Sequence, residues 1–155
     1  MTNFEGLQLA QPILHAIADE GYTTPSPIQA KSIPPLLEGR DLLGVAQTGT
    51  GKTAAFALPL LHRLSKHAVK SRPNQPHALI LAPTRELAGQ IGDSLRTYAR
   101  HLGLRSRVIF GGVSARPQIK VLNQGVHILV ATPGRLLDLM NQRHVRLDGI
   151  EVFIL

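Results

Sequence analysis

The sequence predicts an α/β fold in which helices sandwich a parallel β-sheet, and three observations support this prediction. Short apolar runs with few polar positions alternate with helical patterns along most of the chain, which is typical of parallel strands buried on both faces. Hydrophobic residues make up 43% of the 155 residues, a length that corresponds to about one domain. A glycine-rich stretch lies between an apolar run and a helical pattern, an arrangement in which α/β proteins bind phosphate groups.

The first forty residues are predicted to contain two helices. Apolar residues recur on one helical face over residues 9–20, with Pro12 in the first turn and Gly21 just after the end. A second, short helix is expected to begin at Ser26-Pro27, because a capping residue followed by proline starts many helices. The pair Pro34-Pro35 is expected to interrupt this helix.

The rest of the chain alternates expected strands and helices. Strands are predicted over residues 41–46, 78–82, 107–110, 127–131 and 151–155, and helices over residues 52–67, 85–102, 115–123 and 134–142. Residues 70–76, which include two prolines, are expected to form an exposed connection. Crossovers between parallel strands are right-handed, and ligands of such sheets bind beyond the carboxyl ends of the strands. We therefore expect the functional residues at that edge.

Composition excludes several classes of protein. Cysteine is absent, which excludes a disulfide framework, a cysteine-based zinc site and a thiol nucleophile. No stretch reaches the ~20 apolar residues of a membrane span, and residues 1–5 lack the pattern of a secretory signal. We therefore expect a soluble, cytoplasmic protein with no membrane partner. The seven histidines show neither H-x-x-H nor H-E-x-x-H spacing, so no metal-ligand role is expected for them.

The charge balance indicates a polyanionic partner. Seventeen Lys and Arg against ten Asp and Glu give a net charge of +7, which favours nucleic acid. The alternative is a basic surface that serves solubility alone. Aromatic residues make up only 4% and tryptophan is absent, so contacts with backbone phosphates are expected rather than extensive base stacking.

Residues 46–53 read A-Q-T-G-T-G-K-T and connect a predicted strand to a predicted helix. This stretch departs from the phosphate-loop pattern G-x-x-x-x-G-K-[ST] only where Ala46 replaces the first glycine. Glycines let backbone N–H groups turn toward phosphate oxygens, Lys52 would reach the β- and γ-phosphates, and the Thr53 hydroxyl would bind Mg²⁺. The alternative is a glycine-rich turn before an ordinary helix. The predicted nucleotide-binding residues here are Ala46, Gln47, Thr48, Gly49, Thr50, Gly51, Lys52 and Thr53.

A candidate adenine-binding stretch precedes this loop. Residues 21–29 read G-Y-T-T-P-S-P-I-Q, and Gln29 lies 23 residues before Lys52. A glutamine amide has a donor and an acceptor, and can pair with the N6 and N7 edge of adenine. Phe4 and Tyr22 could pack against the base. Considered alone, the stretch is an ordinary capped helix start; the phosphate loop that follows favours the adenine-binding interpretation.

These motifs resemble those of the DEAD-box ATP-dependent RNA helicases. The stretch 21–29, with Phe4 seventeen residues before it, resembles their Q motif, and residues 46–53 resemble their motif I. P-T-R-E-L-A at 83–88, G-G at 111–112 and T-P-G-R at 132–135 resemble motifs Ia, GG and Ib. The surrounding sequence is most similar to the bacterial RhlE-type subgroup. The resemblance predicts a Q-motif region over residues 1–30. Over residues 31–155 it predicts part of the first RecA-like domain, ending just before the D-E-A-D motif.

The resemblance implies a protein that couples ATP binding and hydrolysis to local unwinding of RNA duplexes. ATP or ADP and Mg²⁺ would be the cofactors, Lys52 and Thr53 the catalytic residues within this chain, and a second RecA-like domain a partner in cis. RNA would be held by its sugar–phosphate backbone. The implied RNA-binding residues are Pro83, Thr84, Arg85, Gly111, Gly112, Thr132, Pro133, Gly134 and Arg135. Taken singly, the stretches at 83–88 and 132–135 also fit capped helix starts.

The 155 residues contain neither a D-E-A-D nor an S-A-T sequence. The chain stops on the apolar run 152–155, so we expect it to be part of a longer protein. We also expect negligible ATP hydrolysis from these residues alone, because phosphoryl transfer needs further charged groups around the γ-phosphate. Two other functions remain open. One is a phosphate-loop enzyme of another kind, such as a small-molecule kinase, and the other is a non-catalytic module that binds nucleotide or RNA.

Overall fold

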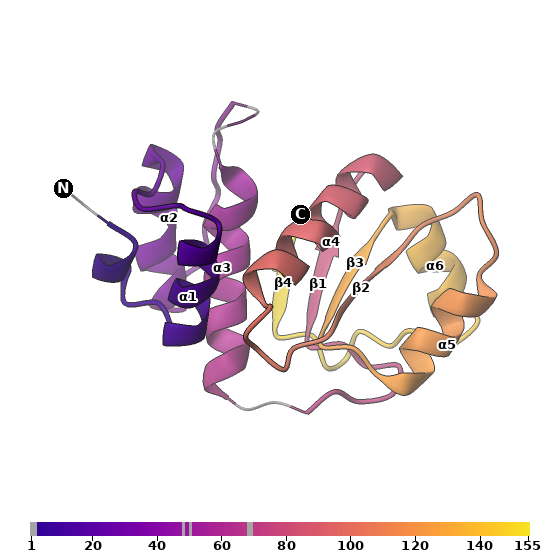
Figure 1. Ribbon diagram of the computed structural model, residues 1–155. Helices are drawn as coiled ribbons and strands as arrows, with labels where there is room; N and C mark the ends of the chain where they lie inside the picture. The colour runs from indigo at the N-terminus through magenta and orange to yellow at the C-terminus, as the bar shows by residue number, and fades with distance from the viewer. Residues whose placement is uncertain (1–2, 48, 50, 68–69) are drawn as a thin grey trace. The chain divides into compact units, whose positions relative to one another are not determined.

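The computed structural model describes residues 3–155 except residues 48, 50 and 68–69 (Figure 1). The chain forms two compact units. Unit 1 consists of Met1–Ala68 and Ser94–Gly103, and unit 2 consists of Val69–Asp93 and Leu104–Leu155.

Unit 1 is built mainly of helices. Its elements are η1 (Glu5–Leu7), α1 (Gln11–Asp19), α2 (Pro27–Leu37) and α3 (Lys52–Lys66), and α2 packs along α3. The predicted first helix is confirmed, since α1 carries Pro12 in its first turn and is followed by Gly21 at a φ of +75°. The fully buried side chains of this unit include Ile13, Ile17, Ile33, Leu58, Leu61 and Leu64.

The predicted interruption of α2 at its two prolines is wrong. The helix runs through Pro34 and Pro35 to Leu37. Each proline removes one N–H donor, but its carbonyl can still accept. Here the carbonyl of Pro34 accepts from the Glu38 N–H at 3.2 Å and that of Pro35 accepts from the Arg40 N–H at 3.1 Å. The helix therefore tolerates the prolines because they lie close to its end, and because α2 is packed against α3.

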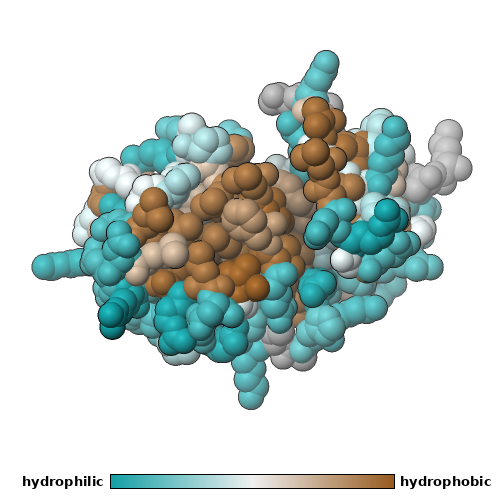
Figure 2. Space-filling view, turned by 180° about the vertical axis from the view of Figure 1, so that it is seen from behind, coloured by the Kyte–Doolittle hydropathy of each residue, from teal (hydrophilic) through white to brown (hydrophobic). Residues whose placement is uncertain are grey.

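The strand expected over residues 41–46 is also wrong. Residues 41–47 belong to no helix or strand of the described chain, and Leu43 and Val45 are 92% and 88% exposed. Figure 2, coloured by hydropathy, shows that apolar side chains reach the surface on this face of the molecule. Apolar composition is necessary for a buried strand, but the strand itself is formed by hydrogen bonds to a neighbouring backbone. The described strands pair with one another and not with this segment.

Unit 2 contains the predicted parallel sheet. Its strands are β1 (Ala78–Leu81), β2 (Ser106–Ile109), β3 (Ile128–Ala131) and β4 (Val152–Ile154), in the order β2-β3-β1-β4 with every pair parallel. The strands are in register, so that Ala78 lies opposite Ile128 on one side and opposite Val152 on the other. All four fall within the stretches that apolar periodicity predicted, apart from one extra residue at the start of β2.

Helices cover both faces of this sheet. On one face, α5 (Arg116–Gln124) and α6 (Pro133–Asn141) pack on a buried cluster that includes Leu79, Ile109 and Leu129. Val108 points to the opposite face because strand side chains alternate, and there it contacts Gly92 of α4 (Arg85–Tyr98). The α/β arrangement is therefore confirmed. The helix α4 belongs to unit 2 up to Asp93 and to unit 1 from Ser94, and it ends four residues before the predicted position.

Within the part of the chain that the structure describes, none of the helices combines the length and apolar composition needed to cross a membrane.

Candidate nucleotide and nucleic-acid sites

The glycine-rich loop of unit 1 ends at the amino terminus of α3. Gly51 caps this helix with a φ of +87°, and Gly49 has a φ of +81°. L-residues rarely adopt such values, which explains why glycine occupies both positions. Lys52 and Thr53 are the first two residues of α3, so the unpaired N–H groups of its first turn open toward the loop. Thr48 and Thr50, which were also predicted to bind phosphate, lie outside the described residues.

The side chain of Lys52 lies over the backbone of the loop. Its Nζ donates a hydrogen bond of 2.7 Å to the carbonyl of Ala46, the first residue of the motif. An ammonium group has three donors, and this bond uses one of them. Ala46 is half-buried, whereas Gln47 and Gly49 are exposed. This bond holds the ammonium group of Lys52 beside the first residue of the glycine-rich loop.

Gln29 connects the start of α2 to the end of this loop. Its Oε1 accepts a hydrogen bond of 3.0 Å from the Ser26 N–H, and the Ser26 hydroxyl accepts from the Gln29 N–H at 3.5 Å. These two bonds form a capping box, so the capped helix start is confirmed. In addition, Nε2 of Gln29 donates to the Gly51 carbonyl at 3.2 Å. Counted over the described residues, these bonds leave one N–H and one lone pair of the amide for a further partner.

The two aromatic residues predicted near the base differ in exposure. Phe4 is buried directly before η1, where it belongs to the core of unit 1, whereas Tyr22 is 52% exposed. Of the two, only Tyr22 presents a large ring surface on which a planar ligand could stack.

The three candidate RNA-binding stretches of unit 2 lie at one edge of its sheet. Residues 83–85 follow β1, residues 111–112 follow β2, and residues 132–135 follow β3. Because β1, β3 and β2 are adjacent parallel strands, their carboxyl ends meet at the same edge. The structure therefore brings these three predicted stretches to one edge. The first stretch, 83–85, and the last, 132–135, are at least 47 positions apart in the sequence.

Arg85 and Thr84 are held at this edge by local contacts. The Thr84 hydroxyl accepts a hydrogen bond of 3.2 Å from the Leu87 N–H, so it caps α4 as well as lying at the edge. The guanidinium of Arg85 lies 4.5 Å from the centre of the Phe110 ring, a cation–π contact. Arg85 is nevertheless exposed, and Gly112 beside it has a φ of +80°. The arginine is oriented by the ring while its donors remain accessible.

Arg135 is used differently from Arg85. Its side chain is only 10% exposed, and it donates to Gln118 Oε1 at 2.9 Å and to the Val113 carbonyl at 2.8 Å. Gln118 in turn donates through Nε2 to the Phe110 carbonyl at 3.1 Å. Arg135 therefore ties α6 to the loop after β2, which contains the two glycines. Binding of RNA phosphates by Arg135 stays a prediction, and any such contact has to share these donors.

Sequence reasoning missed the residues that support this edge. Phe110 directly precedes the two glycines, so its position was a usable signal. Gln118 and the Val113 carbonyl carried no such signal, because their role depends on the packing of α5 and α6 against the loop.

Comparison with known proteins gives consistent results. The family model for the DEAD/DEAH box helicase matches residues 26–155. The chain is 44% identical over 155 residues to DEAD-box ATP-dependent RNA helicase 30 of Arabidopsis thaliana and 46% identical to ATP-dependent RNA helicase DeaD of Escherichia coli strain K12. It is 42% identical to DEAD-box ATP-dependent RNA helicase CshA of Bacillus cereus. These matches cover 99–100% of the chain but only 26%, 24% and 29% of the relatives. The chain spans about a quarter of their length and belongs to the DEAD/DEAH box helicase family.

Proposed function

We propose that the protein is an ATP-dependent RNA helicase and that these 155 residues supply its adenine contact, its phosphate loop and part of its RNA-binding edge. The proposal rests on one observation above all, the bond from Gln29 Nε2 to the Gly51 carbonyl. A residue with the right chemistry to read adenine is thereby attached to the loop with the right chemistry to hold phosphate. The names of the similar proteins, all ATP-dependent RNA helicases, support the same function. We place the protein in the cytoplasm.

The residues of unit 1 fit a magnesium nucleotide. The loop has glycines at the two described positions of positive φ, an ammonium group hydrogen-bonded to its first residue and a helix amino terminus at its end. Lys52 would hold the β- and γ-phosphates, and the hydroxyl of Thr53 would contribute a ligand to Mg²⁺. When bound, Mg²⁺ neutralises charge that develops on the phosphates. The remaining amide donor and acceptor of Gln29 would contact adenine, which distinguishes it from guanine.

The edge of unit 2 would hold single-stranded RNA without reading its sequence. Arg85, Thr84, Thr132 and the backbone around Gly111 and Gly112 offer hydrogen-bond donors that suit phosphate and ribose. In the whole protein, a second RecA-like domain in cis would close over ATP and RNA, and hydrolysis would reopen the pair. The driving force would be the higher affinity of both ligands for the closed state.

Calorimetric titration of the chain with Mg·ADP and with Mg·GDP tests the nucleotide part. We expect ADP to bind more tightly, and we expect Gln29→Ala to reduce that preference. Gln29→Glu is the matched variant, because a carboxylate can still accept from the Ser26 N–H but cannot donate to the Gly51 carbonyl or to adenine N7. It should keep the helix cap and lose ADP affinity.

Two results would contradict this proposal. Equal affinities for ADP and GDP would remove adenine reading and favour a phosphate-loop enzyme of another kind. No binding of either nucleotide by a chain whose circular dichroism shows it to be folded would mean that these residues do not hold nucleotide alone. Failure of single-stranded RNA to bind at low salt would separately contradict the RNA part. Absence of ATP turnover by the 155 residues is expected and stays a prediction.

A further inference from the structure

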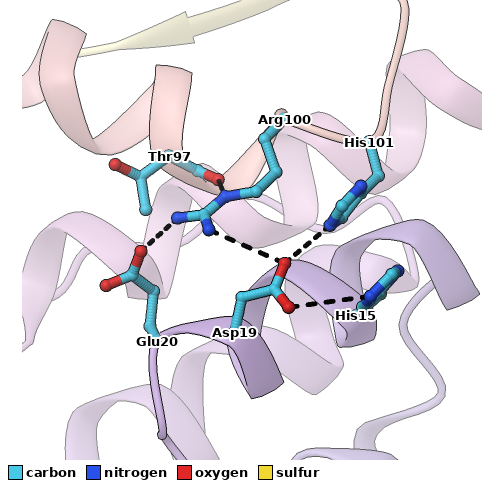
Figure 3. A network of polar contacts seen from close by, with 6 residues as sticks. All are labelled: His15, Asp19, Glu20, Thr97, Arg100 and His101. Carbon is cyan, nitrogen blue, oxygen red and sulfur yellow. Dashed lines mark hydrogen bonds and ion pairs between the residues drawn. The ribbon is translucent and has the colours of Figure 1, made fainter.

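Two histidines and an aspartate that lie far apart in the sequence meet on unit 1, outside the nucleotide and RNA sites. His15 and Asp19 are four residues apart on α1 and therefore share one face of that helix. His101 follows α4 and belongs to the same unit. Figure 3 shows the His15 and His101 rings on the same side of the Asp19 carboxylate. All three side chains are accessible, which a site for a dissolved ion requires.

The donor atoms of these residues converge. Nε2 of His101 lies 2.7 Å from Oδ2 of Asp19, and Nε2 of His15 lies 3.6 Å from Oδ1 of the same carboxylate. The two imidazole rings are stacked, with centroids 3.9 Å apart and planes within 6°. One ligand atom from each residue lies within 4.8 Å of the others. Bonds of about 2.0–2.2 Å to a common ion place tetrahedral ligand atoms roughly 3.3 Å apart. An imidazole binds a metal through a lone pair in its ring plane, so one of the two stacked rings would have to turn for both to reach the same ion.

We propose that His15, Asp19 and His101 bind a divalent transition-metal ion, with Zn²⁺ as the ion of choice. Two imidazole nitrogens and one carboxylate oxygen suit Zn²⁺, Co²⁺ and Ni²⁺, whereas Mg²⁺ and Ca²⁺ prefer oxygen ligands throughout. Three protein ligands leave a fourth position for water.

The neighbouring Arg100 provides a further test of the proposed metal site. Its guanidinium lies 3.6 Å from Oδ2 of Asp19 and also pairs with Glu20 (Figure 3). A bound cation would have to share Asp19 with this positive charge, which weakens binding. Removing the charge of Arg100 should therefore strengthen metal binding, whereas removing any of the three ligands should weaken it. If the cluster were only an ion-pair network that binds no metal, there would be no reason for metal affinity to rise on loss of Arg100 and to fall on loss of a ligand.

Metal binding would join two segments of unit 1 that are distant in sequence. Asp19 and His101 are 82 residues apart, and an ion bound to both would tie α1 to the segment after α4. An ion that binds the folded chain and not the unfolded chain shifts the folding equilibrium toward the folded state. Zn²⁺ should therefore raise the melting temperature of the chain.

The test is a titration of the untagged, chelator-treated chain with Zn²⁺, followed by calorimetry and by thermal melting. We expect one equivalent of Zn²⁺ to bind and to raise the melting temperature. His15→Ala, His101→Ala and Asp19→Asn should each weaken binding about tenfold or more, a loss that even an outer-shell partner can cause. Arg100→Gln should bind Zn²⁺ more tightly than the natural chain.

His67→Ala is the matched control, because His67 is an exposed histidine of the same unit at the end of α3. It should leave the affinity unchanged. Titration with Co²⁺ reads the ligand set directly, since its visible absorption should change in the His15→Ala and His101→Ala chains and not in the control. An affinity equal in all variants, or no saturable binding by the folded natural chain, would overturn the proposal. Asp19→Asn preserves the shape of the side chain and serves where an alanine variant fails to fold.

Discussion

Gly51 is the position at which backbone conformation, side-chain packing and the proposed nucleotide site meet. Its φ is +87°, and a Cβ placed there would lie 3.0 Å from the Ser26 hydroxyl and would overlap Nε2 of Gln29. A left-handed backbone alone costs an L-residue roughly 1–2 kcal/mol. The space beside Gly51 is therefore occupied by the amide that is proposed to read adenine, and any side chain there displaces it.

We predict that Gly51→Ala disrupts this arrangement more than Gly49→Ala does. Gly49 has a similar φ of +81°, but no described atom lies within 4 Å of a Cβ placed on it. Both variants carry the backbone strain, and only Gly51→Ala also pushes Gln29 away. Mg·ADP affinity should therefore fall by about tenfold or more in Gly51→Ala, equivalent to at least ~1.4 kcal/mol, and by less in Gly49→Ala. Equal losses in calorimetric titrations would show that strain alone matters and that Gln29 is not involved.

Sequence patterns name the residues of the proposed nucleotide site but not the contacts between them. The spacing of Gln29, Lys52 and Thr53 is local information, and it was available from the residues alone. The bond from Gln29 to the Gly51 carbonyl depends on how α2 packs against α3. The pairing of His15 with His101 also depends on tertiary packing. Spacing rules for histidines in the sequence could therefore not find this pair. The capping box was visible in outline, since Ser26 and Gln29 stand three residues apart.

The sequence predicts helices and strands correctly where local apolar periodicity determines the secondary structure. It fails where the secondary structure depends on partners elsewhere in the fold. The helices α5 and α6 and the four strands show clear apolar periodicity, and their ends lie within two residues of the prediction. Residues 41–46 have the composition of a strand, but pairing is not encoded in the segment itself. Pro34 and Pro35 normally end a helix, yet α2 continues to Leu37, where packing against α3 offsets the loss of two N–H donors.

The contact between α4 and the sheet depends on a glycine, because there is no room for a side chain at that position. Gly92 is buried, and a Cβ placed on it would overlap Cγ2 of Val108 in β2. Gly89 lies on the same helix, one turn earlier, and a Cβ placed on it would have no described atom within 4 Å. The two glycines therefore have the same intrinsic cost to the helix and different surroundings.

We predict opposite effects of alanine at these two positions. Gly92→Ala should lower the free energy of unfolding by about 1–3 kcal/mol, because the added methyl group separates α4 from β2. Gly89→Ala should raise it by up to about 1 kcal/mol through helix propensity alone. Urea unfolding monitored by circular dichroism measures both. A stabilising Gly92→Ala would show that the helix can shift without cost and that close packing on Val108 is unimportant.

The charge of the whole chain, +7, is spread over seventeen basic residues that differ greatly in their surroundings. Arg135 is nearly buried and bonded to Gln118 and Val113, whereas Arg85 is exposed at the carboxyl edge of the sheet. Arg146 is also exposed, but it precedes β4 and bonds through its N–H to the Asn74 carbonyl, near the amino ends of the strands. If RNA follows the carboxyl edge, equal changes of charge at Arg85 and Arg146 should have unequal effects.

Binding of a single-stranded RNA should therefore weaken with salt in a way that depends on Arg85. Each phosphate neutralised on a single strand contributes about −0.7 to the slope of log K against log salt. We predict that Arg85→Gln makes this slope shallower by about 0.7 and that Arg146→Gln, with the same loss of charge, leaves it unchanged. Fluorescence anisotropy with labelled RNAs of two different sequences measures the slopes, which should agree for both RNAs because backbone contacts carry no sequence information. Equal changes of slope in the two variants would mean that RNA senses only the net charge and does not follow the edge formed after β1, β2 and β3.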